Sequence, residues 1–164
     1  MNQAQADFPS REKLPHIPPG WVKPGSLFFI TLCCSPRGKN HLCHTATAGL
    51  IFESVEFRQR RRDWHVVLLV LMPDHLHMLV SFPHDQEMTK TITRWKSLLA
   101  RKSGISWQRD FFDHRIRSNE SWEEKAEYLR QNPVRGGLVA QGADWKYIWE
   151  PTDGGPGRSA LPPC

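Results

Sequence analysis

Apolar and polar positions in the first half of the chain follow the period of β-strands. The apolar, β-prone segment 27–34 (LFFITLCC) predicts a first strand. Residues 64–72 (WHVVLLVLM) form a near-continuous apolar run, which is typical of a central strand buried on both faces. Residues 75–82 (HLHMLVSF) alternate and predict a partner strand, and Pro73 and Asp74 interrupt the pattern as a turn would.

Two further segments have the period of helices. Residues 45–62 carry their apolar side chains on one stripe and predict a first helix. Residues 86–102 carry a second stripe, with Asp85 as the predicted N-cap and Gly104 as the residue that ends the helix.

The C-terminal third of the chain is less regular. Residues 107–117 (WQRDFFDHRIR) mix aromatic and basic side chains and predict a strand or an extended segment. The capping box at residues 121–124 (SWEE) predicts a third helix that runs to about Asn132 and is ended by Pro133. The segment 138–140 (LVA) predicts a short last strand.

The predicted order is strand, helix, strand, strand, helix, strand, helix. This order indicates the α+β class and matches a ferredoxin-like βαββαβ antiparallel sheet with an added C-terminal helix. A chain of 164 residues can bury one substantial core, so we expect a single domain over residues 26–150. The proline-rich residues 1–25 predict an extended N-terminal arm, and the Pro/Gly-rich residues 151–164 predict a disordered tail.

The overall charge favours an anionic partner. The formal net charge is +5, which suits nucleic acid or a membrane surface. No apolar run reaches the roughly 18 residues that span a bilayer. The N-terminus also lacks the apolar core of a secretory signal. We therefore expect a cytoplasmic protein without a membrane partner.

The cysteines indicate reduced thiols and leave one metal alternative open. The chain has four cysteines and no CxxC motif, so a disulfide framework is not indicated. His41, Cys43 and His44 follow Cys33 and Cys34 closely in the sequence. A zinc site there is conceivable, although this spacing matches no standard zinc finger.

The sharpest local chemical pattern is the pair His75 and His77. On a strand these side chains face the same way, with their Cα atoms about 6.5 Å apart, so both can converge on one metal ion. Leu76 and Met78 then point to the other face and can pack against helices. The alternative is two ordinary histidines on an exposed sheet face.

A second pattern lies in the third predicted helix. Tyr128 and Asn132 are four residues apart and therefore share one helix face. A tyrosine hydroxyl can attack phosphorus when a metal ion polarises the phosphate. Asn132 could add an oxygen ligand beside two imidazoles, and such a mixed site suits Mg²⁺ or Mn²⁺. Spacing alone favours a simpler interpretation, with a half-buried tyrosine and with Asn132 as a C-cap before Pro133.

Three segments in order, LLVLMPDHLHMLV, WQRDFFDHRIR and YLRQNPVRGGLV, resemble the single-tyrosine HUH transposases, in particular the branch of REP-associated tyrosine transposases. The resemblance extends over residues 14–139. His75 and His77 match the family's metal motif. Tyr128 matches the nucleophile on the added helix, and Asn132 takes the place of the amide that completes the metal site.

The resemblance implies a transesterification on single-stranded DNA that forms hairpins, such as repetitive extragenic palindromes. Tyr128 would attack a scissile phosphate with the help of Mg²⁺ or Mn²⁺ and form a 5′-phosphotyrosine. The 3′-OH of another cleaved strand would then resolve that linkage, which gives strand transfer. The resemblance leaves open whether the protein acts as a monomer or as a homodimer.

Basic residues on the first two predicted helices and near the motifs are candidates for phosphate contacts. They are Arg58, Arg60, Arg61, Arg62, Lys96, Arg115, Arg117 and Arg135. For each of them, a solvated surface position is the alternative. His114, in the second motif, could act structurally or position substrate. Tyr147 lies in an aromatic, strand-like segment and is interpreted as a packing residue.

Two other functions are compatible with the pattern. The first is a non-catalytic nucleic-acid-binding protein on the same ferredoxin-like fold, which would keep the arginines without needing Tyr128. The second is a metal-dependent hydrolase, which would need a general base beside the metal, and Asp74 and Glu53 are the candidates for that base.

Overall fold

The computed structural model describes residues 26–152 and the backbone of residues 155–159, so the predicted N-terminal arm lies outside the described residues. Six strands form one sheet in the order β4-β1-β3-β2-β5-β6, and all neighbours are antiparallel. The strands are β1 (Leu27–Cys33), β2 (His65–Met72), β3 (His75–Ser81), β4 (Phe112–Arg115), β5 (Ile148–Thr152) and β6 (Gly155–Ser159). The order β4-β1-β3-β2 confirms the predicted ferredoxin-like sheet, which β5 and β6 extend at one edge.

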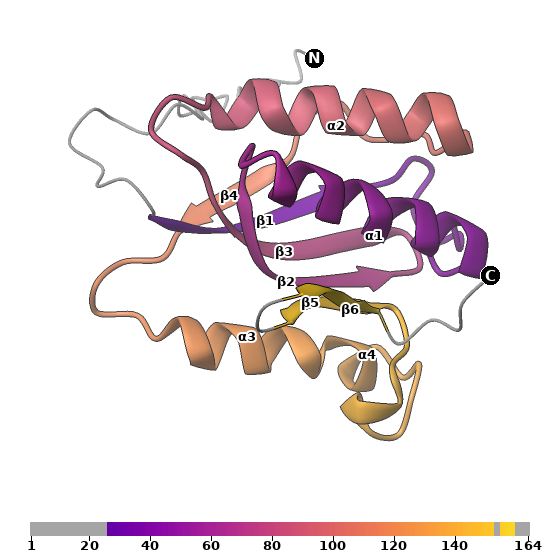
Figure 1. The fold of residues 1–164 in the computed structure, drawn as a ribbon. Coiled ribbons are helices and arrows are strands. Elements are labelled where there is room, and N and C mark those ends of the chain that lie inside the picture. Colours follow the sequence, from indigo (N-terminus) through magenta and orange to yellow (C-terminus); the bar gives the residue numbers. More distant parts are fainter. Residues whose placement is uncertain (1–25, 153–154, 160–164) are drawn as a thin grey trace, which may run out of the picture.

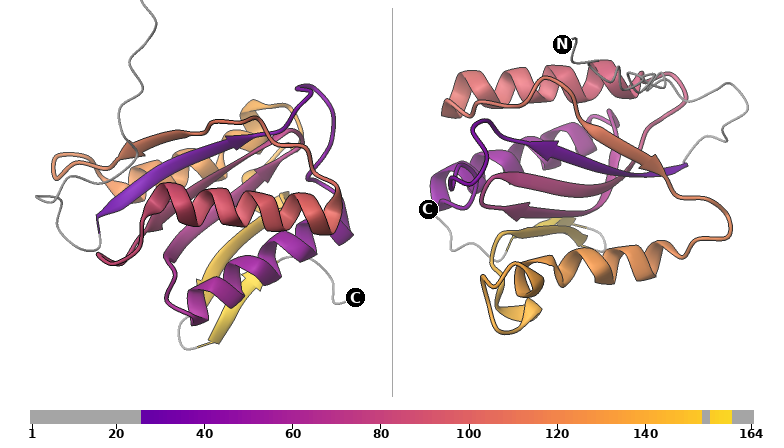
Figure 2. Two further views of the ribbon diagram at one scale, coloured as in Figure 1. Left: turned by 90° about the horizontal axis from the view of Figure 1, so that it is seen from above. Right: turned by 180° about the vertical axis from the view of Figure 1, so that it is seen from behind.

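Helices cover both faces of this sheet and give the protein three layers (Figure 1 and Figure 2). Two long helices lie on one face, and a shorter helix with a single-turn continuation lies on the other, here called the α3 face. The helices are α1 (Thr45–Arg60), α2 (Met88–Ser103), α3 (Trp122–Arg130) and α4 (Asn132–Arg135), and the 3-10 turn η1 (Gly142–Asp144) precedes β5. Among the described residues, no helix is long and apolar enough for a bilayer crossing.

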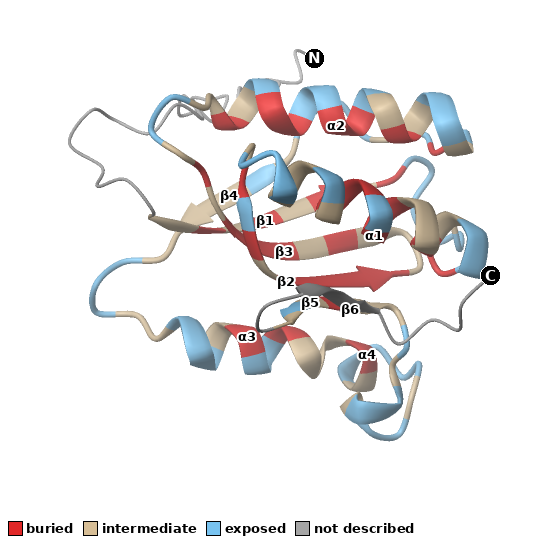
Figure 3. Ribbon diagram, viewed as in Figure 1, coloured by how far each residue is buried: buried red, intermediate tan, exposed pale blue. Residues whose placement is uncertain are grey.

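The two faces bury cores of unequal size, as the buried residues in Figure 3 indicate. The larger core lies between the sheet and α1 and α2, and it includes Met78 and Trp95. The smaller core lies under α3 and includes Leu79 and Leu129. Adjacent residues of β3 therefore enter different cores, as strand alternation requires.

The structure confirms the predicted helix boundaries at Gly104 and Ser121. Gly104 ends α2 in the left-handed conformation at φ 72°, and its N–H donates to Ala100 O at 2.9 Å. Ser121 caps α3, because its Oγ accepts from Glu124 N at 3.1 Å. Asp85 does not cap α2, which begins two residues later than predicted. A turn closed by Gln86 N–H donating to Pro83 O at 3.0 Å delays the first helical residue.

The prediction that Pro133 ends the third helix was wrong. α3 ends at Arg130, and after Gln131 the chain turns once more as α4, with Pro133 in the first turn. A proline is tolerated there because its missing N–H would have no partner within the helix. The backbone from α3 to α4 remains helical, since Gln131 N donates to Glu127 O and Arg135 N donates to Gln131 O.

Two predictions for the C-terminal part also need correction. Residues 138–140 form no strand. Leu138 N–H instead donates to Pro133 O at 2.9 Å, so this segment is bonded to the end of the helix. The last strands lie later in the chain: β5 pairs with β2 through Ile148 and Trp149, and β6 pairs with β5. The predicted tail beginning at residue 151 is therefore ordered into strands at residues 151–152 and 155–159.

Candidate active site

His75 and His77 lie at the start of β3, beside the turn that joins it to β2. We call this end of the sheet the hairpin end. Alternate residues of β3 face the same side of the sheet, so both histidines face the same side as Leu79, which packs in the core of the α3 face. Leu76 packs in the opposite core. Their ring centroids are 4.8 Å apart at an interplanar angle of 79°. The two histidines thus share one face, as strand periodicity predicts.

His77 is held on both sides by β1. Its Nδ1 shares a hydrogen bond of 2.8 Å with Thr31 Oγ1, and its ring stacks on Phe29 with centroids 5.4 Å apart. Burial, followed by the charges of His75 and Arg37, lowers the pKa of His77 to about 3. The ring is therefore neutral at pH 7, which is the state in which an imidazole can bind a metal ion.

His75 is oriented by its neighbour Asp74. The His75 Nδ1 and Asp74 Oδ1 atoms are 2.7 Å apart. The other carboxylate oxygen accepts from Gly38 N at 2.7 Å and pairs with Arg37 Nε at 3.1 Å. Burial raises the pKa of Asp74, but the Gly38 hydrogen bond, His75 and the Arg37 charge together lower it below its usual value. A charged carboxylate thus fixes the His75 ring.

Both rings are therefore held through Nδ1. Among the described residues, no hydrogen bond engages the Nε2 atom of His75 or of His77. A metal-binding histidine commonly bonds one ring nitrogen to a protein group and offers the other to the ion. The pair fits a metal site of this kind. A third protein ligand would have to be of another residue type, since the described part of the chain gathers no group of three or more His, Cys, Asp or Glu.

The structure does not support the zinc alternative around the cysteines. Cys34 and Cys43 are buried, and burial raises the pKa of each thiol to about 12, so neither is a ready thiolate ligand. His41 Nε2 bonds to Pro36 O at 2.8 Å, and His44 Nε2 bonds to a backbone oxygen in the same loop. These contacts fasten the loop and leave no shared ligand site.

Tyr128 and Asn132 lie on the helical turns of the α3 face. Tyr128 is on the solvent side of α3 and is 52% exposed, so its ring is accessible from outside. Asn132 is the first residue of α4, one turn further on. The Arg135 guanidinium lies 4.0 Å from the centroid of the Tyr128 ring, and its Nη1 is 3.5 Å from Asn132 Oδ1. Arg135 thus contacts both predicted functional side chains.

The end of α4 reaches the hairpin end of the sheet, where the histidines lie. Met72 pairs with His75 across the β2–β3 ladder and belongs to the core under α3. Met72 Cε lies close to Gly136, the residue just after α4. A Cβ built on Gly136 would be 3.3 Å from this atom. Figure 1 shows α4 at the end of the sheet where β2 finishes. No hydrogen bond or ring contact among the described residues joins Tyr128 directly to His75 or His77.

Two of the predicted phosphate contacts occupy structural positions instead. Arg58 is largely covered and pairs with Asp63 at 3.2 Å, while its guanidinium lies 5.7 Å from the centre of the Trp64 ring. Lys96 is 8% exposed, and its Nζ donates to the carbonyl oxygens of Gln108 at 2.7 Å and Arg109 at 3.0 Å. These contacts tie the segment before β4 to α2, so neither side chain is available to DNA.

The other basic candidates are spread over the molecule. Arg60, Arg61 and Arg62 follow one another where α1 ends, Arg115 and Arg117 lie at and after the end of β4, and Arg135 lies beside Tyr128. Arg60, Arg61, Arg62, Arg117 and Arg135 are exposed, and Arg115 is partly buried.

His114 and Tyr147 have contacts of their own. His114 Nε2 is 3.1 Å from the Glu120 carboxylate, which also accepts from Arg117 N, so His114 helps to close the link between β4 and α3. Tyr147 packs on the larger core with its ring 5.2 Å from that of Trp145, as expected for a packing residue.

Comparison with known proteins identifies relatives of this chain. The family model described as transposase IS200 like matches residues 30–131. A REP-associated tyrosine transposase of Escherichia coli K12 is 24% identical over 130 residues, covering 77% of each chain. A Haemophilus influenzae protein provisionally named as the same kind of transposase is 27% identical over 147 residues, covering 75% of this chain and 78% of its own.

A solved structure shares the fold. It is that of a REP-associated tyrosine transposase bound to a REP hairpin, with a TM-score of 0.66 and 24% identity, and the match covers 78% of both chains. The family model spans β3, which carries both histidines, and α3, which carries Tyr128. The chain therefore belongs to the IS200-like transposase family.

Proposed function

We propose that the protein nicks single-stranded DNA and transfers the cleaved strand through a covalent bond to Tyr128, with the help of a divalent metal ion. The observation that carries this proposal is the way in which the two histidines are held. Thr31 and Asp74 engage both Nδ1 atoms, and the Nε2 atoms are left for a ligand on the face that α3 and α4 cover. Tyr128, exposed on the outer side of α3, would supply the nucleophile.

His75, His77 and Asn132 would hold Mg²⁺ or Mn²⁺. Two imidazole nitrogens and one amide oxygen with open positions suit a hard divalent ion that also binds a phosphate. When bound, the ion polarises the scissile phosphate and stabilises the charge on the departing oxygen. The Asn132 amide would turn from its 3.5 Å contact with Arg135 toward the histidines.

Tyr128 would carry the covalent step. Its Oη attacks phosphorus and forms an O–P bond while the bond from phosphorus to the 3′ oxygen breaks. The phenol proton passes to solvent, and the released 3′ oxygen gains a proton. The product is a 5′-phosphotyrosine and a free 3′-OH. When the 3′-OH of another strand attacks the same phosphorus, the tyrosine leaves and a new phosphodiester bond is formed.

Arg135 would assist this step. A guanidinium over an aromatic ring favours the more negative form of that ring, so it stabilises the charge that develops on the phenol oxygen. The same cation also lies where it can pair with a phosphate oxygen next to the nucleophile.

The proposed substrate is hairpin-forming single-stranded DNA, including REP-type palindromes. Both curated relatives are named as REP-associated tyrosine transposases, the second of them provisionally, and the solved relative is bound to a REP hairpin. The positive net charge of +5 and the exposed arginines suit the phosphate backbone of such a substrate.

The test is a covalent-adduct assay on a denaturing gel. The full chain is incubated with Mn²⁺ and end-labelled hairpin DNA that carries single-stranded flanks. We expect a protein–DNA band that resists denaturation and disappears in Tyr128→Phe and in His75→Ala. Tyr147→Phe is the matched control, because it removes a phenol hydroxyl from a packing residue and should leave the band unchanged.

Two results would contradict the proposal. Cleavage without a covalent adduct would indicate a metal-dependent hydrolase in which water is the nucleophile. Binding without cleavage, with several hairpins and with both Mg²⁺ and Mn²⁺, would indicate a non-catalytic nucleic-acid-binding protein on this fold.

A further inference from the structure

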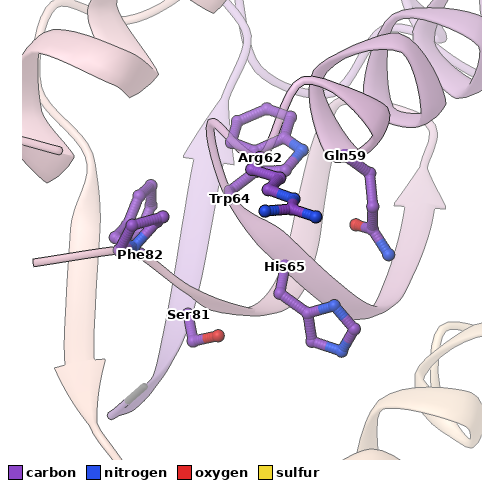
Figure 4. Close-up of a pocket in the computed structure, with 7 residues that line it drawn as sticks. Gln59, Arg62, Trp64, His65, Ser81 and Phe82 are labelled. Carbon is purple, nitrogen blue, oxygen red and sulfur yellow. The ribbon is translucent and has the colours of Figure 1, made fainter. Parts of the chain in front are cut away.

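A second concave site lies at the opposite end of the β2–β3 hairpin. It is a cavity of about 280 Å³, here called the corner pocket, where α1 turns into β2 and β3 ends (Figure 4). It is lined by Gln59, Arg62, Trp64, His65, Ser81 and Phe82. We infer that the corner pocket binds one unpaired nucleotide of the DNA substrate. The inference rests on the proposed function, since it names a further contact with the same DNA.

The corner pocket is separate from the histidine site. His65 pairs with Ser81 at one end of the β2–β3 ladder, and Met72 pairs with His75 at the other. Seven residue steps along β2 correspond to about 23 Å at the rise of a β-strand. His75 and Ser81 have the same parity on β3 and face the same side of the sheet. Leu79, buried under α3, lies between them, so the two sites would be separate contacts on one DNA molecule.

The backbone at Arg62 is unusual. Arg62 N donates to Gln59 O and Asp63 N donates to Arg58 O, which is the Schellman pattern that ends many helices. The left-handed position of this motif is usually glycine, but here Arg62 occupies it at φ 61°. Among the described residues, Arg62 is the only non-glycine with a positive φ. The side chain is thus present at a conformational cost, which favours a function for it.

Arg62 also differs from the arginines around it because the nearby carboxylates pair with those arginines. Asp63 pairs with Arg58 at 3.2 Å and with Arg61 at 3.7 Å, and Glu56 pairs with Arg60. Within residues 26–152, Arg62 forms no ion pair. An exposed cation at the rim of a cavity that forms no ion pair within the described residues favours an anionic ligand such as a phosphodiester.

The rest of the lining suits a base. Trp64 and Phe82, almost fully buried, form the apolar back wall, and the His65 ring is exposed for stacking. Gln59 is fixed in place, because its amide accepts from Val66 N at 2.7 Å and donates to Val66 O at 3.3 Å. Figure 4 shows the Arg62 guanidinium between Gln59 and Phe82, above His65.

The size of the corner pocket limits the ligand. Cavities that hold drug-sized ligands span roughly 300–1,000 Å³, so this cavity has room for a single base and not for a duplex. An exposed aromatic ring beside a cation, as His65 and Arg62 provide here, is a usual combination for binding unpaired bases.

Cross-linking provides the first test. The full chain with Tyr128→Phe, which cannot form the proposed covalent adduct, is irradiated with hairpin DNA that contains 5-iododeoxyuridine in place of thymidine. One probe carries the label in the hairpin loop and the other carries it in the single-stranded flank. We expect cross-linked peptides that contain His65 or Phe82 with one of the two probes, which identifies the source of the nucleotide. Cross-links that fall only outside residues 59–65 and 81–83 with both probes would overturn the inference.

A variant provides the second test. Arg62→Gly removes the guanidinium and also relieves the positive φ, so weaker binding cannot be explained by misfolding. We expect the Kd for hairpin DNA to rise roughly tenfold and its salt dependence to decrease by about one phosphate contact, with no decrease in Tm. The charge-matched control is Arg101→Gln, an exposed residue in the last turn of α2, which should leave the Kd unchanged. An equal change in both variants would contradict the inference.

The two proposals fail in different ways. If wild-type protein forms the Tyr128 adduct but the cross-links avoid the corner pocket, the inference fails and the proposed function stands. If the cross-links fall in the corner pocket but no adduct forms, the DNA contact stands and the nicking mechanism fails.

Discussion

The two faces of the sheet bury different kinds of side chain. Toward α1 and α2, the strands contribute a continuous apolar core in which Trp95 packs edge-on against Trp64 with centroids 5.0 Å apart. On the α3 face, the core is smaller and shares β3 with two polar rings, His75 and His77. Strand alternation allows one short segment to serve both faces. Stability should therefore depend mainly on the first face, and chemistry on the second.

The largest change in stability is expected from Trp95→Ala on the first face. Trp95 is fully buried and its Nε1 donates to Ser54 Oγ at 2.8 Å, so truncation removes packing and a hydrogen bond. The free energy of unfolding should fall by about 3–5 kcal/mol. Denaturant titration measures the change, with the exposed Trp122→Ala as the control. Covalent-adduct formation per folded molecule should remain unchanged, and a large decrease would mean that the faces are coupled.

On the α3 face, Leu129→Ala should affect stability and chemistry together. Leu129 is fully buried and anchors α3 in the smaller core. The free energy of unfolding should fall by about 2–4 kcal/mol. The adduct rate of the folded protein should also fall, because Tyr128 is carried by the same helix. Single-turnover rates at a temperature where the variant is folded measure this, and an unchanged rate would show that α3 does not need its core to position the nucleophile.

A smaller and more selective effect is expected from Asp74→Asn. The substitution keeps the size of the side chain but removes the charge that fixes His75 and pairs with Arg37. Loss of such a supporting contact typically weakens metal binding by about 10–100-fold. Mn²⁺ binding followed by electron paramagnetic resonance would measure it, with the exposed Asp144→Asn as the control. Equal Mn²⁺ affinity in the two variants would argue against His75 as a ligand.

The parts of the site that depend on local periodicity were predictable from the sequence. The shared face of His75 and His77 follows from strand alternation, and the start of α3 follows from Ser121 and Glu124. Each of these features needs only residues that are close together in the chain, so one sequence is sufficient to find them.

The parts that depend on tertiary neighbours were not predictable. Thr31 meets His77 only because β1 and β3 pair in one register, across 46 positions of sequence. From the sequence, Lys96 is a candidate for a phosphate contact. In the structure its Nζ donates to Gln108 O and Arg109 O. The strand β5 was only partly indicated, by the strand-like segment around Tyr147, because its end lies in a segment whose composition favours disorder; pairing with β2 overrides that preference.

The smallest effect is expected at Arg62, where a substitution should stabilise the fold. A non-glycine residue in the left-handed region costs about 1–2 kcal/mol, and the greater freedom of glycine in the unfolded chain offsets part of that cost. Arg62→Gly should therefore raise the free energy of unfolding by up to about 1 kcal/mol. Arg62→Ala is the matched comparison, because it removes the same guanidinium and keeps the strained φ. Urea midpoints at a constant m-value would measure the difference. Equal stability of the two variants would mean that the backbone at Arg62 is not strained. The positive φ would then no longer be a reason to assign Arg62 a function in DNA binding.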